Sequence, residues 1–527
     1  MNMRKAWAGI AAVAAAALVG ALGAAPSPAF AAGIGVNNAA DLQGAIDDSM
    51  IDTVILDDDI TASVTVPEGK TLVIDLNGHT LTNEDGKHTI TNNGTLTITG
   101  DGTVDNVSHG KAAVYNNVGG TATLGAANYT RSKEAGSSPD EPNGNSYYNI
   151  LNQGTMTIES GAVVKQDGHF SSLIDNGWYS GSQNTGKVPA KLTINGGDFS
   201  GGINTIKNDD WGELVINDGT FSNNTGAALM NWNVAEVNGG TFNITQDGAR
   251  VFSNGYGDDV MDKGQLTITN GTFTASDNGA GDLFTSGKDS ANGGTVSISG
   301  GTFVGALNGI EANAINVSVS GGTFSDQNVI KHVAADTAVV KSTEGFSVKA
   351  GTDAAETSLA KVVVNGTNLY FDSVDDAKAY AKENGYPESD VQVVQYVVTF
   401  VANGETTDVY YVKVGEALGE LPEIPEYEGH TVDGWYVNVT ENADGSATGT
   451  KIDETYVPTG DTTVTAMWTE NAPVTPSTPA ADTKPAEAPK KALPQTGDNT
   501  NAVLPVVIAG VGIVVIAAAI VLRRRHN

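Results

Sequence analysis

The sequence contains no cysteine, few aromatic residues and few histidines. Without cysteine the chain can form no disulfide and offers no thiolate ligand to a metal ion. Aromatic residues make up 6% of the chain, whereas 64 of the 527 residues are glycine. This balance favours strands and turns over large helical domains. The seven histidines are scattered without metal-ligand spacing, so we expect neither a cofactor nor a metal site.

Basic residues are scarce as well. The chain has 61 acidic and 28 basic residues, which gives a formal net charge of −33. A surface of this charge repels nucleic acid, so we expect no nucleic-acid partner. Neutral glycans, cations and basic proteins remain as candidate ligands. The same charge would also keep a protein soluble at a crowded surface without any ligand.

Long apolar runs are confined to the two ends of the chain. Residues 1–31 begin with Arg4 and Lys5, continue with an alanine-rich apolar run, and end with Ala29 and Ala31. These are the three parts of a secretory signal, including the small-x-small pattern of its cleavage site. We therefore predict export and cleavage after Ala31, with an uncleaved N-terminal anchor as the alternative.

The second apolar run, residues 502–522, has no charged residue and is long enough as a helix to cross a bilayer. Three consecutive arginines follow it and favour a cytoplasmic position for the tail. The motif that precedes it consists of Leu493, Pro494, Gln495, Thr496 and Gly497. This three-part end, residues 493–527, resembles the LPXTG sorting signal of cell-wall-anchored proteins.

The resemblance implies that a sortase cuts between Thr496 and Gly497 and joins Thr496 covalently to peptidoglycan. The apolar helix is then a transient membrane insertion, and the finished protein lies in the cell wall with its exposed part on the extracellular face. Residues 470–492, before the motif, are rich in proline. Such a composition favours an extended stalk that spans the wall.

Most of the chain repeats one phrase. Residues 192–199 read LTINGGDF, and related phrases that end in phenylalanine recur with spacings of 22, 21, 31, 30 and 21 residues. Apolar and polar residues alternate within each phrase, as in a half-buried strand. A period of this length is typical of a solenoid, in which one phenylalanine per rung would stack on the next. These residues are Phe199, Phe221, Phe242, Phe273, Phe303 and Phe324.

The repeats resemble the right-handed parallel β-helix of pectate-lyase-like surface proteins, over residues 36–345. The resemblance implies an all-β fold, a parallel β-helix solenoid of about twelve rungs. A short amphipathic helix at residues 41–50 would cap the first rung. A leucine-rich repeat is disfavoured, because its L-x-x-L-x-L spacing and its asparagine ladder are missing.

Two smaller segments follow the solenoid. Residues 346–395 contain strand-like runs and a helix that Ser373 caps and Gly385 stops, which predicts a small α/β segment. Residues 396–469 carry the elements VTF, LP, GWY and a late tryptophan in that order. They resemble the internalin-type B-repeat, which implies a small β-grasp-like module. We expect its Trp435 and Trp468 to pack in the core.

One corner of the solenoid collects aromatic and acidic residues. It follows an apolar strand in successive rungs, and the two clear insertions in the period fall there. Flat aromatic rings beside carboxylates suit sugar rings, through stacking and hydrogen bonds to hydroxyls, so we predict a ligand-binding corner. Its residues are Trp178, Tyr179, Asp209, Asp210, Trp211, Trp232, Tyr256, Asp258 and Asp259. The alternative is a set of polar, solvent-facing turns.

Catalysis at this corner is a further alternative. Asp209 with Asp210 or Asp258 would form the acid and base of a glycosidase, and Lys207 and Arg250 are the only basic residues nearby. The grouped NTD, DD, GHG and RIK signatures of the family are absent apart from the pair Asp209-Asp210. We therefore assign no catalytic residue.

An insertion at residues 125–149 adds a second set of candidate contacts. Its Tyr129, Arg131, Tyr147 and Tyr148 suit a partner surface, since loops that exceed a regular scaffold often carry function. Three functions stay open on this basis: an adhesin that binds glycans or host proteins, a polysaccharide lyase or glycoside hydrolase, and a structural spacer without a ligand.

Overall fold

The computed structural model describes residues 33–134, 147–179, 183–255, 264–287, 293–443 and 446–472. The predicted export signal with Ala29 and Ala31, nearly all of the proline-rich stalk, and the sorting signal lie outside these residues. Within the described residues, no helix has the length and apolar character needed to span a membrane. The described chain consists mainly of short strands, as predicted for an all-β protein.

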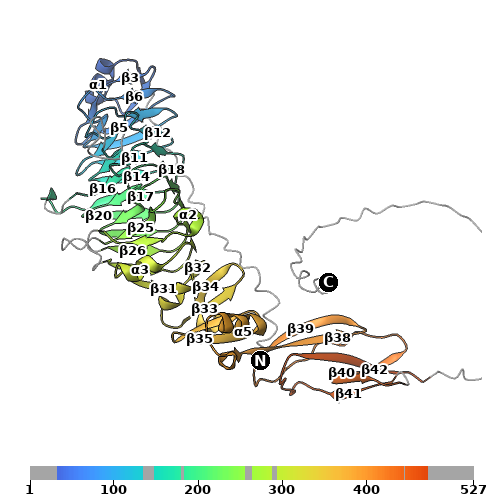
Figure 1. Cartoon of the computed structure of the whole chain (residues 1–527). Coiled ribbons are helices and arrows are strands. Elements are labelled where there is room, and N and C mark those ends of the chain that lie inside the picture. The colour runs from blue at the N-terminus through green and yellow to red at the C-terminus, as the bar shows by residue number, and fades with distance from the viewer. Residues whose placement is uncertain are drawn as a thin grey trace, which may run out of the picture. The chain divides into compact units, whose positions relative to one another are not determined.

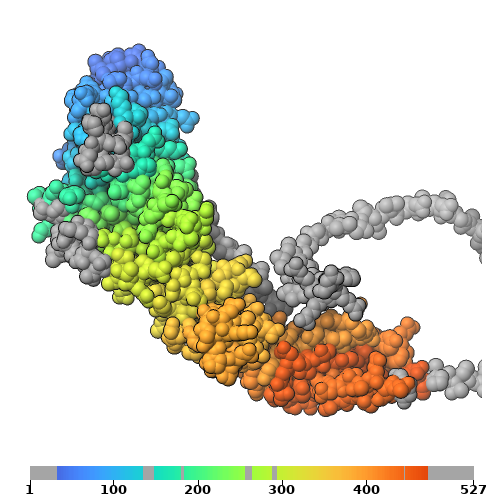
Figure 2. Space-filling view, in the orientation of Figure 1, coloured from blue at the N-terminus to red at the C-terminus, as the bar shows by residue number. Residues whose placement is uncertain are grey.

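Three parallel sheets, which we call A, B and C, form the sides of a solenoid (Figure 1). In most rungs the chain passes through a strand of sheet A, then sheet B, then sheet C, and each strand pairs in parallel with the equivalent strand of the next rung. Figure 2 shows these rungs packed as one continuous body, from the first rungs in blue to the last in yellow. The predicted parallel β-helix is confirmed.

Sheet A has twelve strands, in agreement with the predicted number of rungs. They are β1 (Ile34–Val36), β2 (Thr53–Leu56), β5 (Thr71–Asp75), β8 (Thr95–Thr99), β11 (Thr121–Leu124), β14 (Thr155–Ile158), β17 (Ala190–Ile194), β20 (Gly212–Ile216), β23 (Val234–Val237), β26 (Gln265–Ile268), β29 (Thr295–Ile298) and β31 (Asn316–Val319).

Sheet B begins with eleven solenoid strands. They are β3 (Ile60–Thr61), β6 (Thr80–Thr82), β9 (Thr103–Asp105), β12 (Asn128–Thr130), β15 (Val163–Lys165), β18 (Asp198–Ser200), β21 (Thr220–Ser222), β24 (Thr241–Asn243), β27 (Thr272–Thr274), β30 (Thr302–Val304) and β32 (Gly322–Phe324).

Sheet C has nine strands and carries the candidate site. They are β4 (Val64–Val66), β7 (Ile90–Asn92), β10 (Val114–Asn116), β13 (Ile150–Asn152), β16 (Ile174–Asn176), β19 (Ile206–Asn208), β22 (Ala227–Asn231), β25 (Arg250–Asn254) and β28 (Phe284–Thr285). Short helices lie at the first rung and between the last strands: α1 (Ala39–Asp47), α2 (Ser276–Gly279), α3 (Asn308–Ala312) and the 3-10 helix η3 (Gln327–Lys331).

A column of phenylalanines runs through the interior along sheet B. Phe199 pairs in register with Phe221, and the same register repeats up to Phe324. Neighbouring rings lie 4.3–5.2 Å apart between centroids, and every ring of the column is buried. Aromatic pairs at this separation contribute about 0.5–1.5 kcal/mol each beyond the burial of their area. The predicted column is confirmed.

A second inward column consists of asparagines at the end of sheet C strands. Each except the last donates a side-chain hydrogen bond from Nδ2 to Oδ1 of the asparagine in the next rung, at 2.7–2.9 Å. Its members, all fully buried, are Asn92, Asn116, Asn152, Asn176, Asn208, Asn231 and Asn254. The last, Asn254, donates to backbone carbonyl oxygens. The expectation that the chain lacks an asparagine ladder is therefore wrong. The ladder satisfies polar side chains that would otherwise be costly to bury.

A glycine stands two to four residues after several ladder asparagines, where the chain passes so close to the ladder that a side chain has no space. A Cβ atom on Gly212 would lie 2.3 Å from Asn208 Oδ1 and 2.5 Å from the carbonyl oxygen of Asn176. On Gly154 it would lie 2.3 Å from the carbonyl oxygen of Gly120. The chain must pass this close to the ladder to enter the next strand of sheet A.

Sheet B continues beyond the solenoid. The strand β32 pairs antiparallel with β34 (Gly345–Ala350), and the sheet runs on through β33 (Thr337–Ser342), β36 (Thr367–Phe371), β35 (Ala360–Val364) and β37 (Gln392–Val393). The predicted boundary between residues 345 and 346 falls within the paired strands β33 and β34. The solenoid and the small α/β segment thus share one sheet.

Three helices accompany this part of sheet B: α4 (Gly351–Thr357), α5 (Val374–Glu383) and the 3-10 helix η4 (Glu388–Asp390). The predicted capping of α5 is confirmed. The hydroxyl of Ser373 accepts a hydrogen bond from the backbone N–H of Asp376 at 3.0 Å, and Gly385 has a φ of 77° just beyond the helix. Both are ordinary helix-terminus interactions.

The last described segment is a five-stranded sheet in the order β39 (Glu405–Lys413), β38 (Gln395–Ala402), β42 (Thr462–Glu470), β40 (His430–Glu441) and β41 (Ala447–Lys451). It has its own apolar core. Trp435 is buried there with its ring edge-on to Phe400, and Trp468 packs partly buried against the same core. Both tryptophans pack as expected.

The ladder yields a test of how strongly one rung depends on the next. We expect Asn176→Ala to lower the free energy of unfolding by at least about 2 kcal/mol, because it leaves buried partners in two rungs without hydrogen bonds. Chemical denaturation of the purified protein measures this. Asn195→Ala, which removes an exposed asparagine bonded to Glu159, should change it by less than about 0.5 kcal/mol. Equal losses would contradict the ladder's role.

Candidate functional site on the outer face of sheet C

The middle residue of each sheet C strand points away from the solenoid interior, because its neighbours on both sides face inward. Strand pairing places these middle residues in one row. The row contains Tyr115, Leu151, Asp175, Lys207 and Met230. Outward residues of sheet A such as Thr193 remain at least partly exposed, whereas Leu151, Asp175 and Lys207 are buried. The flanking turns therefore cover this part of sheet C.

A charged cluster occupies the covered part of the row. Lys207 Nζ lies 2.5 Å from Asp209 Oδ2, and the side chain of Asp175 in the preceding rung is hydrogen-bonded to Asp209. The three residues are at most 7% exposed. A buried charge is tolerated only when it is paired and hydrogen-bonded. Asp209 has such a partner in Lys207, whereas Oδ1 of Asp175 is buried without a hydrogen-bond partner.

Burial and charge make the two carboxyl groups unequal. Burial raises the pKa of Asp175 well above its ordinary value near 3.8, and the negative charge of Asp209 raises it further. Burial also raises the pKa of Asp209, but the ammonium group of Lys207 opposes this. We therefore place the proton on Asp175, which donates to the ionised Asp209, and Asp209 in turn pairs with Lys207.

Aromatic rings surround the lysine. Its Nζ lies 4.1 Å from the ring centroid of Trp232 and 5.0 Å from that of Tyr179, both within the range of cation–π attraction. Trp232 and Trp178 are buried, whereas Tyr179 is 69% exposed. Tyr148 lies beside both carboxyl groups, and burial is the main reason that its pKa is raised. The cluster thus presents one open aromatic ring, that of Tyr179.

The structure brings together most of the residues predicted for the corner. Asp210 is buried and its carbonyl accepts a hydrogen bond from the backbone N–H of Trp178 at 3.1 Å, which joins two rungs. Trp211 follows in a left-handed conformation with a φ of 63°, which costs of order 1–3 kcal/mol for a bulky residue. The remaining predicted residues, Tyr256, Asp258 and Asp259, lie outside the described residues. The ligand-binding role of the corner stays a prediction.

The sequence places Asp175 in a turn of this corner but not among the predicted ligand-binding residues, and it indicates Lys207 only as a nearby basic residue. The signal was present: both are charged residues between an inward isoleucine and a ladder asparagine, in the sequences Ile-Asp-Asn and Ile-Lys-Asn. Conversely, two residues of the insertion that were expected on a partner surface are not exposed. Tyr129 and Arg131 are fully buried, and Arg131 pairs with Glu134 at 3.0 Å, so neither forms part of a partner surface.

The geometry of the cluster bears on the chemistry it can perform. A glycosidase holds its two carboxyl groups about 5–9 Å apart, on either side of an accessible glycosidic bond. Asp175 and Asp209 instead bond to each other and are buried. Across the described ranges, no three His, Asp or Glu side chains form a group able to hold a metal ion. This arrangement holds the side chains of the cluster in place.

Comparison with known proteins identifies one end of the chain. The family model described as the LPXTG cell wall anchor motif matches residues 487–527, which include Leu493 to Gly497 and the apolar run. No curated protein and no solved structure matches the chain. The protein is a cell-wall surface protein whose motif implies processing by sortase and attachment to peptidoglycan. Its resemblances to pectate-lyase-like and internalin-type proteins stay predictions.

The buried carboxyl pair predicts a pH dependence of stability. Because the folded-state pKa of Asp175 is raised, its favourable contribution is complete below about pH 3.8 and is lost as the pH rises through the folded-state value. Asp175→Asn cannot ionise, so the variant should gain stability relative to the native protein as the pH rises from 4 towards 8. Unfolding midpoints measured across this range test the prediction.

Asp198→Asn is the matched control, since it removes one exposed carboxylate of sheet B. If the difference in unfolding midpoint between Asp175→Asn and the native protein stays constant with pH, the proposed protonation of the pair is contradicted.

The anchor motif predicts the location of the protein directly. Thr496→Ala should shift the protein from the cell-wall fraction to the membrane and the medium, because sortase joins the threonine carbonyl to the wall. Immunoblots of wall, membrane and medium fractions measure this. Thr500→Ala, just outside the motif, should leave the protein in the wall. Wall attachment of the Thr496→Ala variant would contradict the assignment.

Proposed function

We propose that this wall-anchored protein is an adhesin that binds neutral glycans on the outer face of sheet C. The observation that carries the proposal is the exposed ring of Tyr179 held above Lys207, at the edge of a covered charged cluster. An exposed aromatic face is the usual stacking surface for a sugar ring, whose C–H groups are apolar on one side.

The cluster beneath the ring supports binding because it restricts motion. The side chain of Lys207 is buried, paired with Asp209 and packed against Trp232, so it loses little further freedom when a ligand arrives. Tyr179 stacks on this fixed ammonium group. Groups that are ordered before binding contribute more affinity, because less conformational entropy is lost.

The charge of the protein decides between glycan classes. A net charge of −33 opposes the approach of polymers of uronic acid, which carry one carboxylate per sugar. The one cation of the cluster is already neutralised by Asp209. Neutral oligosaccharides meet neither obstacle. We therefore place neutral glycans before acidic ones and before a host protein as the ligand.

The proposal is tested by binding of the purified protein to an array of neutral and acidic oligosaccharides. We expect neutral glycans to bind. The substitution Tyr179→Ala should lower their affinity about tenfold, which corresponds to the loss of one stacking contact. Tyr411→Ala removes a ring of similar exposure, 62%, from the C-terminal sheet and should leave binding unchanged. Absence of any glycan binding, or equal effects of the two variants, would refute the proposal.

A further inference from the structure

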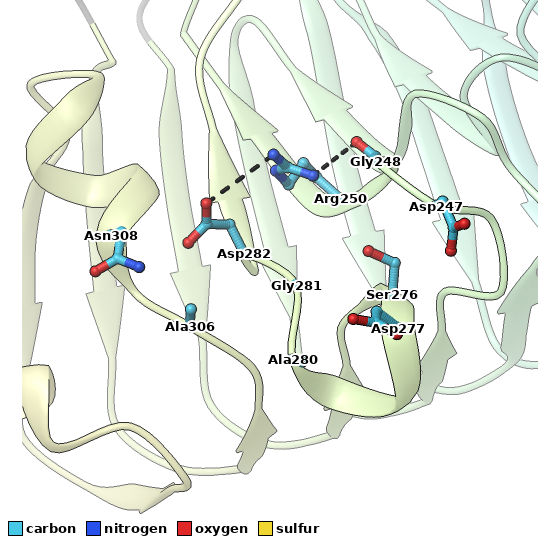
Figure 3. A pocket seen from close by; sticks show the side chains of 10 residues that line it. All are labelled: Asp247, Gly248, Arg250, Ser276, Asp277, Ala280, Gly281, Asp282, Ala306 and Asn308. Atoms are coloured by element: carbon cyan, nitrogen blue, oxygen red, sulfur yellow. Dashed lines mark hydrogen bonds and ion pairs between the residues drawn. The ribbon is translucent and has the colours of Figure 1, made fainter.

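A hollow lies at the edge of sheet C opposite the candidate site, where the chain arrives from sheet B. It is a cavity of about 420 Å³ between the turn before β25, the helix α2 with the turn after it, and the start of α3. Figure 3 shows the residues that line it, with Arg250 and Asp282 facing each other. The residues used below are Arg250, Asp282, Asp247, Asp277, Ser276 and Asn308. Ligand-binding pockets commonly have a volume of about 300–1,000 Å³.

Arg250 is held in place on one side only. Its Nη1 donates to the carbonyl oxygens of Gly248 and Ala249, at 2.6 and 3.2 Å. Its Nη2 faces Asp282 Oδ2 at 4.0 Å (Figure 3), which is an ion pair but too long for a hydrogen bond. The other carboxylate oxygen, Asp282 Oδ1, is buried without a hydrogen-bond partner.

Hydrogen bonds to the next rung fix the backbone around Asp282. Asp282 forms a parallel bridge with Ala306, and the backbone N–H groups of Leu283 and Ala306 donate across it at 2.9 and 2.8 Å. Arg250 Nη2, a donor, and Asp282 Oδ2, an acceptor, thus lie in neighbouring rungs at a separation that one bridging atom can span.

The gap suits a hydroxyl group. An oxygen atom about 2.9 Å from both Arg250 Nη2 and Asp282 Oδ2 can accept from the guanidinium and donate to the carboxylate. An ammonium group only donates and would leave Arg250 Nη2 without an acceptor. An anion only accepts and would meet three carboxylates, those of Asp247, Asp277 and Asp282. A neutral ligand with hydroxyl groups fits both partners.

The remaining lining residues suit a ligand that carries several hydroxyl groups. The hydroxyl of Ser276 and the side-chain amide of Asn308 each offer a donor and an acceptor around the cavity, so adjacent hydroxyls of one ligand find partners. We infer that the cavity around Arg250 and Asp282 is a second binding site of this protein, specific for a single neutral sugar residue. It uses residues separate from Tyr179 and does not rest on the proposed function.

The test uses the purified protein and a set of neutral methyl glycosides of glucose, galactose, mannose and N-acetylglucosamine, with binding followed by saturation-transfer NMR and titration calorimetry. At least one glycoside should bind, and Asp282→Asn and Arg250→Ala should each weaken it about tenfold or more, because a charge-assisted hydrogen bond is lost. Asp218→Asn, an exposed carboxylate outside the cavity, should not change the affinity. Unfolding midpoints establish that each variant is folded.

Tyr179→Ala separates this inference from the glycan-binding function proposed above. Glycoside binding that persists in Tyr179→Ala and is lost in Asp282→Asn supports the second site, whatever the outcome of the glycan array. The inference is overturned if no neutral glycoside binds the Tyr179→Ala protein. It is also overturned if Asp282→Asn binds as the native protein does, or if acetate or inorganic phosphate binds in preference to the glycosides.

Discussion

Rungs of this solenoid stay in register because two inward columns repeat at the spacing of hydrogen-bonded strands. Phenylalanine rings stack along sheet B, and asparagine amides bond from rung to rung along sheet C. Rings and amides both meet best near the separation of about 4.8 Å that parallel strands impose. A shift by one residue would turn both columns outward, so the two columns together determine which side chains face solvent.

The candidate site follows from this constraint. Because side chains alternate along a strand, Asp175 faces outward when Ile174 and Asn176 face inward. The same holds for Lys207 one rung later. Their alignment places an acid and a base side by side. The turn after each strand then adds Asp209 and the aromatic residues that cover them. A rigid column of rungs therefore arranges groups that lie more than thirty residues apart in the chain.

The phenylalanine column was predictable because a phenylalanine ends each phrase, at a basic period of 21–22 residues that is lengthened in two repeats. The asparagine ladder was not, since asparagine is also the usual residue of polar turns, and only burial distinguishes the two roles. The pairing of Asp175 with Asp209 depends on which residue of one rung faces which residue of the next. Insertions of varying length between rungs hide that register in the sequence. The anchor motif needed no structure, because sortase reads it as a linear signal.

The absence of cysteine makes the register directly measurable by cysteine pairing. Thr193 and Val215 are outward neighbours in adjacent rungs of sheet A, whereas Glu236 lies one rung further on, at about 10 Å from Thr193. A disulfide requires Cα atoms about 4.4–6.8 Å apart. In the stacked solenoid, oxidation should join the two cysteines of a Thr193→Cys/Val215→Cys variant within one chain and leave those of a Thr193→Cys/Glu236→Cys variant unjoined. Efficient disulfide formation in the second variant but not in the first would contradict the stacked solenoid.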